Sequence, residues 1–328
     1  MTLKMIAEMA GTSVSSVSKA FSGSGEISEE TKEKIFRIAK DFGCFEKYYK
    51  APRKQPMIAL IVPEIDSEYY GACASVFERA FNRRGADTII ACTRFDAERE
   101  ARLFRELAYG MKVDGILLWG TGKLIKNHDR IPLVLFGETI SRDTNADLIR
   151  VEYYSAIHTL ISTIKDYGHT EVGFFSEGLA RAKQEWFKKA MRSVGLPLRD
   201  QFIVLSEKRF AEAGRDCMQT LIDRGELPSV IVTAYDQIAY GAMKRAREAG
   251  YKIPDDISFV GTDDIIADTY FDVPLSSIHF DYESVCEEVC DLIFSRIENR
   301  YCRTKEKIVV PARVNIRESL RSFDKQSV

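Results

Sequence analysis

Residues 2–23, "TLKMIAEMAGTSVSSVSKAFSG", hold two short helix patterns separated by a glycine. The apolar residues of the first pattern recur at the spacing of one helix face: Leu3, Ile6, Ala7 and Ala10. Gly11 can adopt the left-handed conformation that ends a helix, while Thr2 and Ser13 stand where a hydroxyl caps the first turn of each helix. This stretch therefore predicts two helices joined by a tight turn.

A third helix pattern runs from about Glu29 to Phe42, with Ser28 as its cap and Gly43 after its end. Its apolar stripe consists of Ile35, Ile38, Ala39 and Phe42. Three short helices with a tight first turn form the plan of a helix-turn-helix domain. We expect such a headpiece over residues 1–45.

The second helix has an outer face suited to DNA. At about 100° per residue, Val17, Ala20 and Phe21 share one arc and can pack against the other helices. The opposite arc is small, hydroxylated and singly basic, and consists of Val14, Ser15, Ser18, Lys19 and Ser22. Hydroxyls bond phosphate oxygens, a lysine reaches a guanine edge or a phosphate, and a valine can touch a thymine methyl. For one serine alone a cap or a solvated surface is the simpler interpretation, but the whole face favours DNA contact.

The composition is that of an ordinary globular protein, with 45% hydrophobic and 29% charged residues in 328, a length that predicts two or three domains. The net charge is −2, yet residues 1–56 carry ten Lys and Arg against seven Asp and Glu, which indicates a polyanion partner for this part. The seven cysteines lack paired spacing, so we expect reduced thiols in the core and no metal site. With no secretory h-region and no membrane-length apolar run, a cytoplasmic protein is expected.

From residue 58 onward, short apolar runs alternate with helical stretches in two series. The runs are 58–62, 88–92, 115–119 and 133–136, then 172–175, 202–205, 230–233 and 257–261. Continuous apolar runs separated by helices predict α/β architecture with two doubly wound parallel sheets. The nucleotide-binding patterns G-x-G-x-x-G and G-x-x-x-x-G-K-[ST] are missing, as are G-x-S-x-G and H-E-x-x-H, so we expect neither an enzyme nor a cofactor.

The residues quoted above, continued by "ISEETKEKIFRIAKDFG", resemble the headpiece of the lactose-repressor (LacI/GalR) family. The later stretches "VDGILLWG", "YGHTEVGFFSEG", "YDQIAYGAMKRAREAGYKIPDDISFVGTDD" and "RESL" resemble the sensor domain of that family, which has the two-lobed fold of periplasmic sugar-binding proteins. The resemblance implies a linker over 46–57, an effector-binding and dimerisation domain over 58–320 and a tail over 321–328. It also implies lobe 1 over about 58–154 and 282–308, and lobe 2 over about 155–281 and 309–320.

The resemblance also implies DNA-contacting residues. Bases would be read by Val14, Ser15 and Lys19, and phosphates would be held by Ser13, Ser18 and Ser28. Thr2 is a further expected DNA-binding residue. Lys19 stands where the family usually has arginine, and lysine lacks the bidentate fork for guanine.

The linker departs from the family, which usually has a hinge helix whose leucine enters the minor groove. No such leucine occurs here, and Pro52 opposes a helix. We expect phosphate contacts from Lys50, Arg53 and Lys54; the alternatives are a wedge made by Tyr48 and Tyr49, or a passive tether.

By resemblance, six residues would line the effector cleft: Tyr69, Tyr70, Lys183, Tyr235, Asp236 and Asp263. The alternative for the two aspartates is helix capping, and the alternative for Tyr69 and Tyr70 is packing under a loop. Glu152 and Tyr153 replace the usual Asp-Asn pair, and Trp186 is expected in the core. A sugar or sugar derivative is the expected effector, although an anionic ligand fits Lys183 equally well.

Together these features predict a transcriptional regulator, most simply a repressor, that binds a palindromic operator as a homodimer under allosteric control by a small molecule. The alternative is a small-molecule sensor with weak or no operator binding. Whether the effector induces or corepresses stays open.

Overall fold

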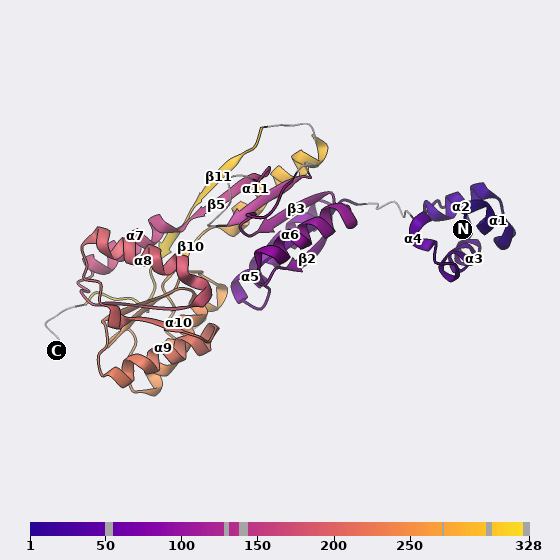
Figure 1. Cartoon of the computed structure of the whole chain (residues 1–328). Helices are drawn as coiled ribbons and strands as arrows, with labels where there is room; N and C mark the ends of the chain where they lie inside the picture. Colours follow the sequence, from indigo (N-terminus) through magenta and orange to yellow (C-terminus); the bar gives the residue numbers. More distant parts are fainter. Residues whose placement is uncertain (50–54, 128–130, 138–143, 271, 300–303, 324–328) are drawn as a thin grey trace. The chain divides into compact units, whose positions relative to one another are not determined.

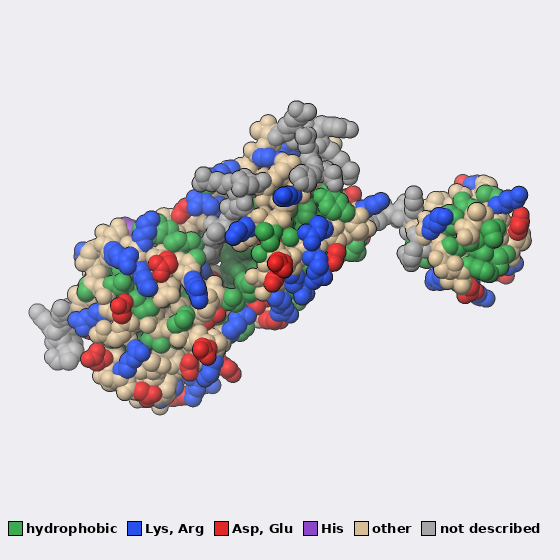
Figure 2. Space-filling view, in the orientation of Figure 1, with side chains coloured by type: hydrophobic (Ala, Val, Ile, Leu, Met, Phe, Trp, Pro, Cys, Tyr) green, Lys and Arg blue, Asp and Glu red, His purple; other side chains and the backbone are tan. Residues whose placement is uncertain are grey.

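The computed structural model describes all residues except 50–54, 128–130, 138–143, 271, 300–303 and 324–328 (Figure 1). The chain divides into two compact units, Met1–Pro56 and Met57–Val328, which we call the N-terminal and the C-terminal unit. Lys, Arg, Asp and Glu side chains are interspersed over the visible face of the C-terminal unit (Figure 2). No helix of the described residues has the length and apolar character that a bilayer crossing needs.

The N-terminal unit consists of four helices: α1 (Leu3–Ala10), α2 (Val14–Phe21), α3 (Glu29–Asp41) and α4 (Phe45–Tyr48). The first three confirm the predicted helix-turn-helix order. Gly11 has a φ of 67° and closes α1, as expected of a residue that must adopt the left-handed conformation.

The core of this unit combines the apolar faces of all four helical segments. Its buried members are Ile6, Ala7, Ala10, Val17, Ala20, Phe21, Ile35, Ala39 and Cys44. The expected place of Phe42 in this core is wrong, because α3 ends at Asp41 and the Phe42 side chain is 55% exposed. Phe36 takes part instead, with its ring centroid 5.6 Å from that of Phe21.

Helix α4 differs from the linker expected after residue 45. The Tyr48 ring lies 5.7 Å from the Phe21 ring, and the Tyr48 hydroxyl donates to the Met1 carbonyl at 2.8 Å. The Tyr49 ring stacks on Phe45 at 4.6 Å. Residues 45–49 therefore pack with the N-terminal unit, which speaks against Tyr48 as a free minor-groove wedge. Lys50, Arg53 and Lys54 lie outside the described residues.

The C-terminal unit is built on two parallel sheets, as predicted. The larger sheet has the order β11-β5-β4-β3-β1-β2. In that order its strands are Lys307–Pro311, Asp147–Glu152, Leu133–Gly137, Gly115–Trp119, Met57–Val62 and Asp87–Cys92. The smaller sheet has the order β7-β6-β8-β9, with strands Ile203–Ser206, Val172–Glu177, Val230–Thr233 and Ser258–Val260.

Helices cover both faces of each sheet, which is why the strands read as continuous apolar runs. In β1, Ile58, Leu60 and Val62 belong to the core that includes α5 (Glu68–Arg83) and α11 (Tyr282–Glu298). Ala59 and Ile61 point the other way and pack with α6 (Ala97–Arg105). At the smaller sheet, Figure 1 shows α7 and α8 on one side and α9 and α10 on the other. These helices span Tyr153–Asp166, Arg181–Val194, Phe210–Arg224 and Asp236–Glu248.

The chain passes between the two sheets three times: from β5 into α7, from β10 (Ser277–His279) into α11, and from β11 into β12 (Arg313–Asn315). Strand β12 pairs with β10 in an antiparallel ribbon. Residues 309–311, expected in lobe 2, belong to the larger sheet because β11 pairs with β5 through Pro311. Strands β5, β10, β11 and β12 were not predicted, because they are short or alternate buried with half-exposed residues.

Candidate functional site

Helix α2 presents the face that the sequence predicts for DNA. Its residues Val17, Ala20 and Phe21 are buried, whereas Ser15 and Ser18 are exposed and Val14 is 46% exposed. The helical placement of these side chains is thereby confirmed, while their contact with DNA stays a prediction.

Three of the hydroxyls expected to contact DNA cap the helices. The hydroxyl oxygens of Thr2, Ser13 and Ser28 accept hydrogen bonds from the backbone N–H groups three residues on, at 3.4, 3.0 and 3.3 Å. A cap uses an oxygen lone pair, so the hydroxyl hydrogen can still be directed at a phosphate. Capping and phosphate contact are compatible roles for these residues.

Lys19, the single basic residue of the recognition face, forms an ion pair with Glu26 from the loop after α2. The hydrogen bond from the Lys19 ammonium lowers the pKa of the Glu26 carboxyl. Sequence reasoning missed this partner, because the two residues are seven apart and separated by a turn. The predicted contact of Lys19 with DNA would have to compete with this ion pair.

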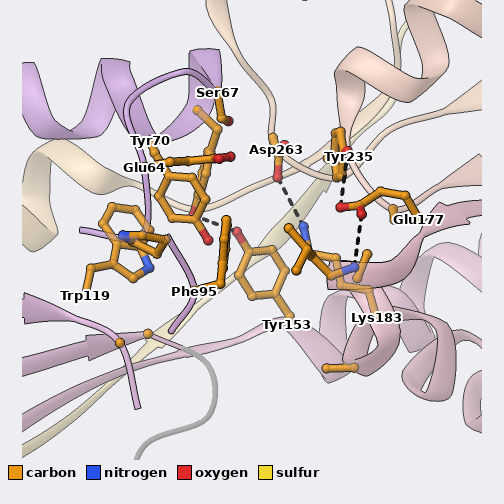
Figure 3. Close-up of a pocket in the computed structure, with 18 of the residues that line it drawn as sticks. Glu64, Ser67, Tyr70, Phe95, Trp119, Tyr153, Glu177, Lys183, Tyr235 and Asp263 are labelled. Atoms are coloured by element: carbon orange, nitrogen blue, oxygen red, sulfur yellow. Dashed lines mark hydrogen bonds and ion pairs between the residues drawn. The ribbon is translucent and has the colours of Figure 1, made fainter. Parts of the chain in front are cut away.

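The C-terminal unit holds a cavity of about 260 Å³ at the carboxyl ends of strands from both sheets (Figure 3). Its wall includes Glu64 after β1 and Trp119 at the end of β3, and across from them Glu177 at the end of β6 and Tyr235 after β8. Between β1 and β3, and between β6 and β8, the strand order reverses direction. Open α/β sheets bind ligands at this switch point, so both sheets turn their binding edge to one cavity.

Tyr69 and Tyr70, from the start of α5, form an aromatic wall with Trp119. The ring centroids of the two tyrosines lie 5.4 and 5.0 Å from that of Trp119. The Tyr69 hydroxyl lies 3.1 Å from that of Tyr153. Burial raises the pKa of Tyr69, and the electrostatic interaction with Tyr153 raises it further. The predicted location of both tyrosines at the cavity is confirmed, while their contact with an effector stays a prediction.

Lys183 and Asp263 meet in the cavity wall, 80 residues apart in the chain. The Lys183 ammonium donates to the Asp263 carboxylate at 3.1 Å and to the Thr262 hydroxyl at 3.1 Å. It also lies 5.1 Å from the ring centroid of Tyr153. The ammonium is thus neutralised by a carboxylate of the wall.

Asp236 has a different role from the one expected. It is fully buried and outside the cavity wall, and its carboxylate accepts from Ser277 Oγ at 2.6 Å and from the backbone N–H groups of Asp263 and Ile265 at 3.2 Å each. Burial and the neighbouring Asp236 carboxylate raise the pKa of Asp268 to about 10. Asp236 therefore supports the loop that carries Asp263. These hydrogen bonds run to that loop and to Ser277 and not to the first turn of α10, as the capping alternative expected.

A buried ion pair across the cavity was missed from the sequence. Arg209, which precedes α9 in lobe 2, donates through both terminal nitrogens to Glu64 of lobe 1, at 2.7 and 2.8 Å. Glu64 is 2% exposed, and its hydrogen bonds raise the pKa of Arg209. The guanidinium lies 5.7 and 4.3 Å from the ring centroids of Phe95 and Phe210. The pair links the two lobes directly.

Phe95 and Phe210 also have an uncommon backbone, with φ values of 60° and 57°. A bulky side chain at positive φ stores strain, and such strain concentrates at functional sites. Both residues line the cavity.

Tyr235 and Tyr153 complete the wall. The Tyr235 hydroxyl accepts from the Phe210 N–H at 3.2 Å and donates to Glu177 at 3.4 Å, and burial raises the pKa of Tyr235. Glu152, which was expected beside Tyr153, lies outside the wall and pairs with Arg150 at 2.6 Å. Trp186 is only half-buried, at the edge of the core.

Two family models match the sequence. Residues 2–43 match the bacterial regulatory proteins of the lacI family, and residues 161–320 match the periplasmic binding protein-like domain. Together the two matches cover more than half of the chain and agree with its two units. The chain belongs to the LacI family.

Relatives in the LacI family match along the whole length. The HTH-type transcriptional regulator DegA of Bacillus subtilis is 27% identical over an alignment of 340 positions, which covers 97% of each protein. The HTH-type transcriptional repressor PurR of Mannheimia succiniciproducens is 26% identical over 337 residues, covering 98% of this chain and 99% of PurR. These relatives are transcriptional regulators, not enzymes, and this LacI-family chain is likewise a DNA-binding regulator.

Solved structures share the fold. The transcriptional regulator CelR in complex with cellobiose has a TM-score of 0.67 at 21% identity, covering 98% of this chain and 100% of CelR. The lac repressor dimer bound to operator and the anti-inducer ONPF has a TM-score of 0.68 at 18% identity, covering 97% and 98%.

Six residues were expected to line the cavity of this LacI-family chain. Five of them line it in the structure, and Asp236 lies behind the lining. Sequence reasoning missed Glu64, Arg209 and Glu177. The one available signal was their position at the end of an apolar strand or within three residues after it, since polar residues there lie at the binding edge of a parallel sheet.

Proposed function

We propose that the chain is a cytoplasmic repressor that binds a palindromic operator as a homodimer and responds to a small molecule, most simply a sugar or sugar derivative. In this proposal residues 1–45 bind DNA, 46–57 connect the units and 58–320 bind the effector and dimerise. The main support is the exposed hydroxylated face of α2 combined with a cavity whose wall is shared by two lobes. The cellobiose of CelR and the operator-bound dimer of lac repressor agree with the proposal.

The proposed mechanism couples the cavity to the recognition helices. Ligand that binds one arrangement of the lobes more tightly shifts the population toward it. In a dimer, a change of lobe angle alters the spacing of the two headpieces, and half-sites one helical turn apart are then held or released. Selection of an inverted-repeat duplex from random sequence tests the first step, and equal binding to all duplexes would leave the small-molecule sensor as the function.

Lys19→Ala is expected to weaken operator binding by about 1–3 kcal/mol if the lysine reads a base, with relaxed preference at one position. If Lys19 contacts only phosphate, binding to all sequences weakens alike. The slope of the logarithm of the binding constant against the logarithm of the salt concentration then falls in magnitude by about one. Fluorescence anisotropy at several salt concentrations separates the two results. Lys34→Ala, an exposed lysine on α3, is the matched control.

Glu26→Gln is expected to tighten operator binding at low salt, because it frees Lys19 and removes a negative charge beside the recognition helix. The gain should fade as salt rises. The same anisotropy titrations measure it, with Glu30→Gln on α3 as the control. An affinity that is unchanged at low salt would show that the ion pair does not compete with DNA.

Asp263→Asn is expected to weaken effector binding by about 1.5–3 kcal/mol, because a charged hydrogen-bonding group of the cavity is lost. Operator binding without effector should persist. Calorimetric titration with the effector measures the loss, and Asp223→Asn on α9, away from the cavity wall, is the control. Equal effector affinity in both variants would remove Asp263 from the site.

A further inference from the structure

The charges of the cavity wall do not balance. Among the described residues that line it, three are acidic, Glu64, Glu177 and Asp263, and two are basic, Lys183 and Arg209. Each basic group engages one carboxylate: Lys183 contacts Asp263 at 3.1 Å, and Arg209 contacts Glu64 at 2.7 Å. One carboxylate, that of Glu177, has no cation as its hydrogen-bonding partner within the described residues.

Glu177 is nevertheless withdrawn from water, since it is only 4% exposed. Its two oxygens accept from the Leu179 N–H at 3.0 Å and from the Tyr235 hydroxyl at 3.4 Å (Figure 3). An ionised carboxylate has about four acceptor positions, so two contacts leave capacity for further donors. Arg209, which is already paired with Glu64, interacts with Glu177 electrostatically but is not among its hydrogen-bonding partners in the described residues. Burying a carboxylate that lacks a hydrogen-bonded cation is unfavourable for the empty protein.

The aromatic residues of the cavity also favour a positively charged ligand. Tyr69, Tyr70, Trp119 and Tyr153 present aromatic rings to the cavity. The faces of aromatic rings are negative and attract cations. Residues 138–143, "ETISRD", follow the cavity residue Gly137 and lie outside the description, but their two acids and one arginine do not supply an excess of positive charge.

We propose that the effector carries a positively charged nitrogen on a small hydroxylated frame, as a hexosamine does, and that the Glu177 carboxylate receives it. This inference rests on the proposed function of the cavity as the effector site. The volume of about 260 Å³ is small for a ligand pocket, which favours a ligand of one ring. Anionic effectors such as hexose phosphates are disfavoured, because both wall cations already have carboxylate partners.

The first test needs no ligand. Glu177→Gln keeps the shape of the side chain and an oxygen for the Leu179 N–H, while it removes the negative charge that has no hydrogen-bonded cation. We expect its thermal midpoint without ligand to lie above that of the wild-type chain, because sites built for a ligand are destabilising when empty. Asp263→Asn, which removes the partner of a cation, should lower the midpoint. A lowered midpoint in Glu177→Gln would show that the carboxylate is a structural cap, and would overturn the inference.

The second test compares matched probes on the full chain. Glucose, glucosamine and glucose 6-phosphate, with the corresponding galactose, mannose and ribose sets, are measured by thermal shift and calorimetry. We expect the tightest probe to be an amine, favoured over its neutral counterpart by about 10- to 100-fold, the value of a hydrogen bond to a buried charge. Glu177→Gln should erase this preference and leave the affinity for the neutral sugar.

The outcomes distinguish this inference from the proposed function. Tightest binding by a phosphate, or an amine preference that survives in Glu177→Gln, overturns the inference and leaves effector control intact. If no probe of any charge shifts the midpoint or changes operator binding, both the inference and effector control by sugars fail. Inverted-repeat binding, measured separately, decides whether the operator function stands.

Discussion

Phe21→Ala is expected to abolish operator binding while residues 57–328 stay folded. Phe21 is buried where α2, α3 and α4 meet, with its ring 5.6 Å from Phe36, 6.2 Å from Phe45 and 5.7 Å from Tyr48. Truncating a buried phenylalanine costs about 3–5 kcal/mol. A unit of about 50 residues buries little surface and has little stability to lose. The variant should therefore unfold the N-terminal unit alone.

Phe42→Ala is the matched control for this prediction. Its side chain belongs to the same unit but is 55% exposed, so the expected change is within about 0.5 kcal/mol. Anisotropy with operator DNA measures binding, and thermal unfolding followed by circular dichroism separates the transitions of the two units. Operator binding of wild-type strength by Phe21→Ala would contradict the assignment of the headpiece core.

Arg209→Met is expected to lower the stability of the C-terminal unit by about 2–4 kcal/mol. Removing one partner of a buried ion pair costs about 3–5 kcal/mol because the other charge is left unpaired. The Arg209 side chain is 34% exposed, which reduces the expected loss somewhat. Glu64 and Arg209 belong to different lobes. The cost of the unpaired Glu64 carboxylate in this variant therefore falls when the lobes separate and water reaches Glu64.

Two measurements check this result. Denaturant unfolding gives the loss of stability, and tryptophan fluorescence reports the cavity, because Trp119 lies in its wall and Trp186 is the other tryptophan. A red shift is expected as Trp119 meets water. Arg215→Met is the control, because Arg215 pairs with Glu248 inside lobe 2 and is 51% exposed. Equal stability and an unchanged spectrum in both variants would show that Glu64–Arg209 does not hold the lobes together.

The three helices of the headpiece, four strands of the larger sheet and all four strands of the smaller sheet could be predicted from the sequence, because their signals are local. Thr2, Ser13 and Ser28 stand at caps, and the helical period alone separates Val17 from Ser18. The same local reasoning failed where the chain leaves a regular element. Phe42 continues the apolar spacing of α3, but the helix ends one residue earlier.

The cavity shows the limit most clearly. Resemblance placed Lys183 and Asp263 in the cleft, and both line the cavity, but it did not predict the ion pair between them. The resemblance also placed Asp236 in the cavity wall. Its carboxylate instead lies behind the wall, where it accepts hydrogen bonds from the backbone of Asp263 and Ile265 and from the Ser277 hydroxyl.

By itself, the sequence determined the three helices of the headpiece, eight strands of the two parallel sheets and the exposed face of α2, because helix period, caps and apolar runs act over a few residues. Only the tertiary structure decided which charges meet. Glu64 and Arg209 are 145 residues apart, and a carboxylate near neutral pH pairs with whichever cation the fold brings within about 3 Å. That same pairing leaves Glu177 as the cavity carboxylate that, among the described residues, has no hydrogen-bonded cation.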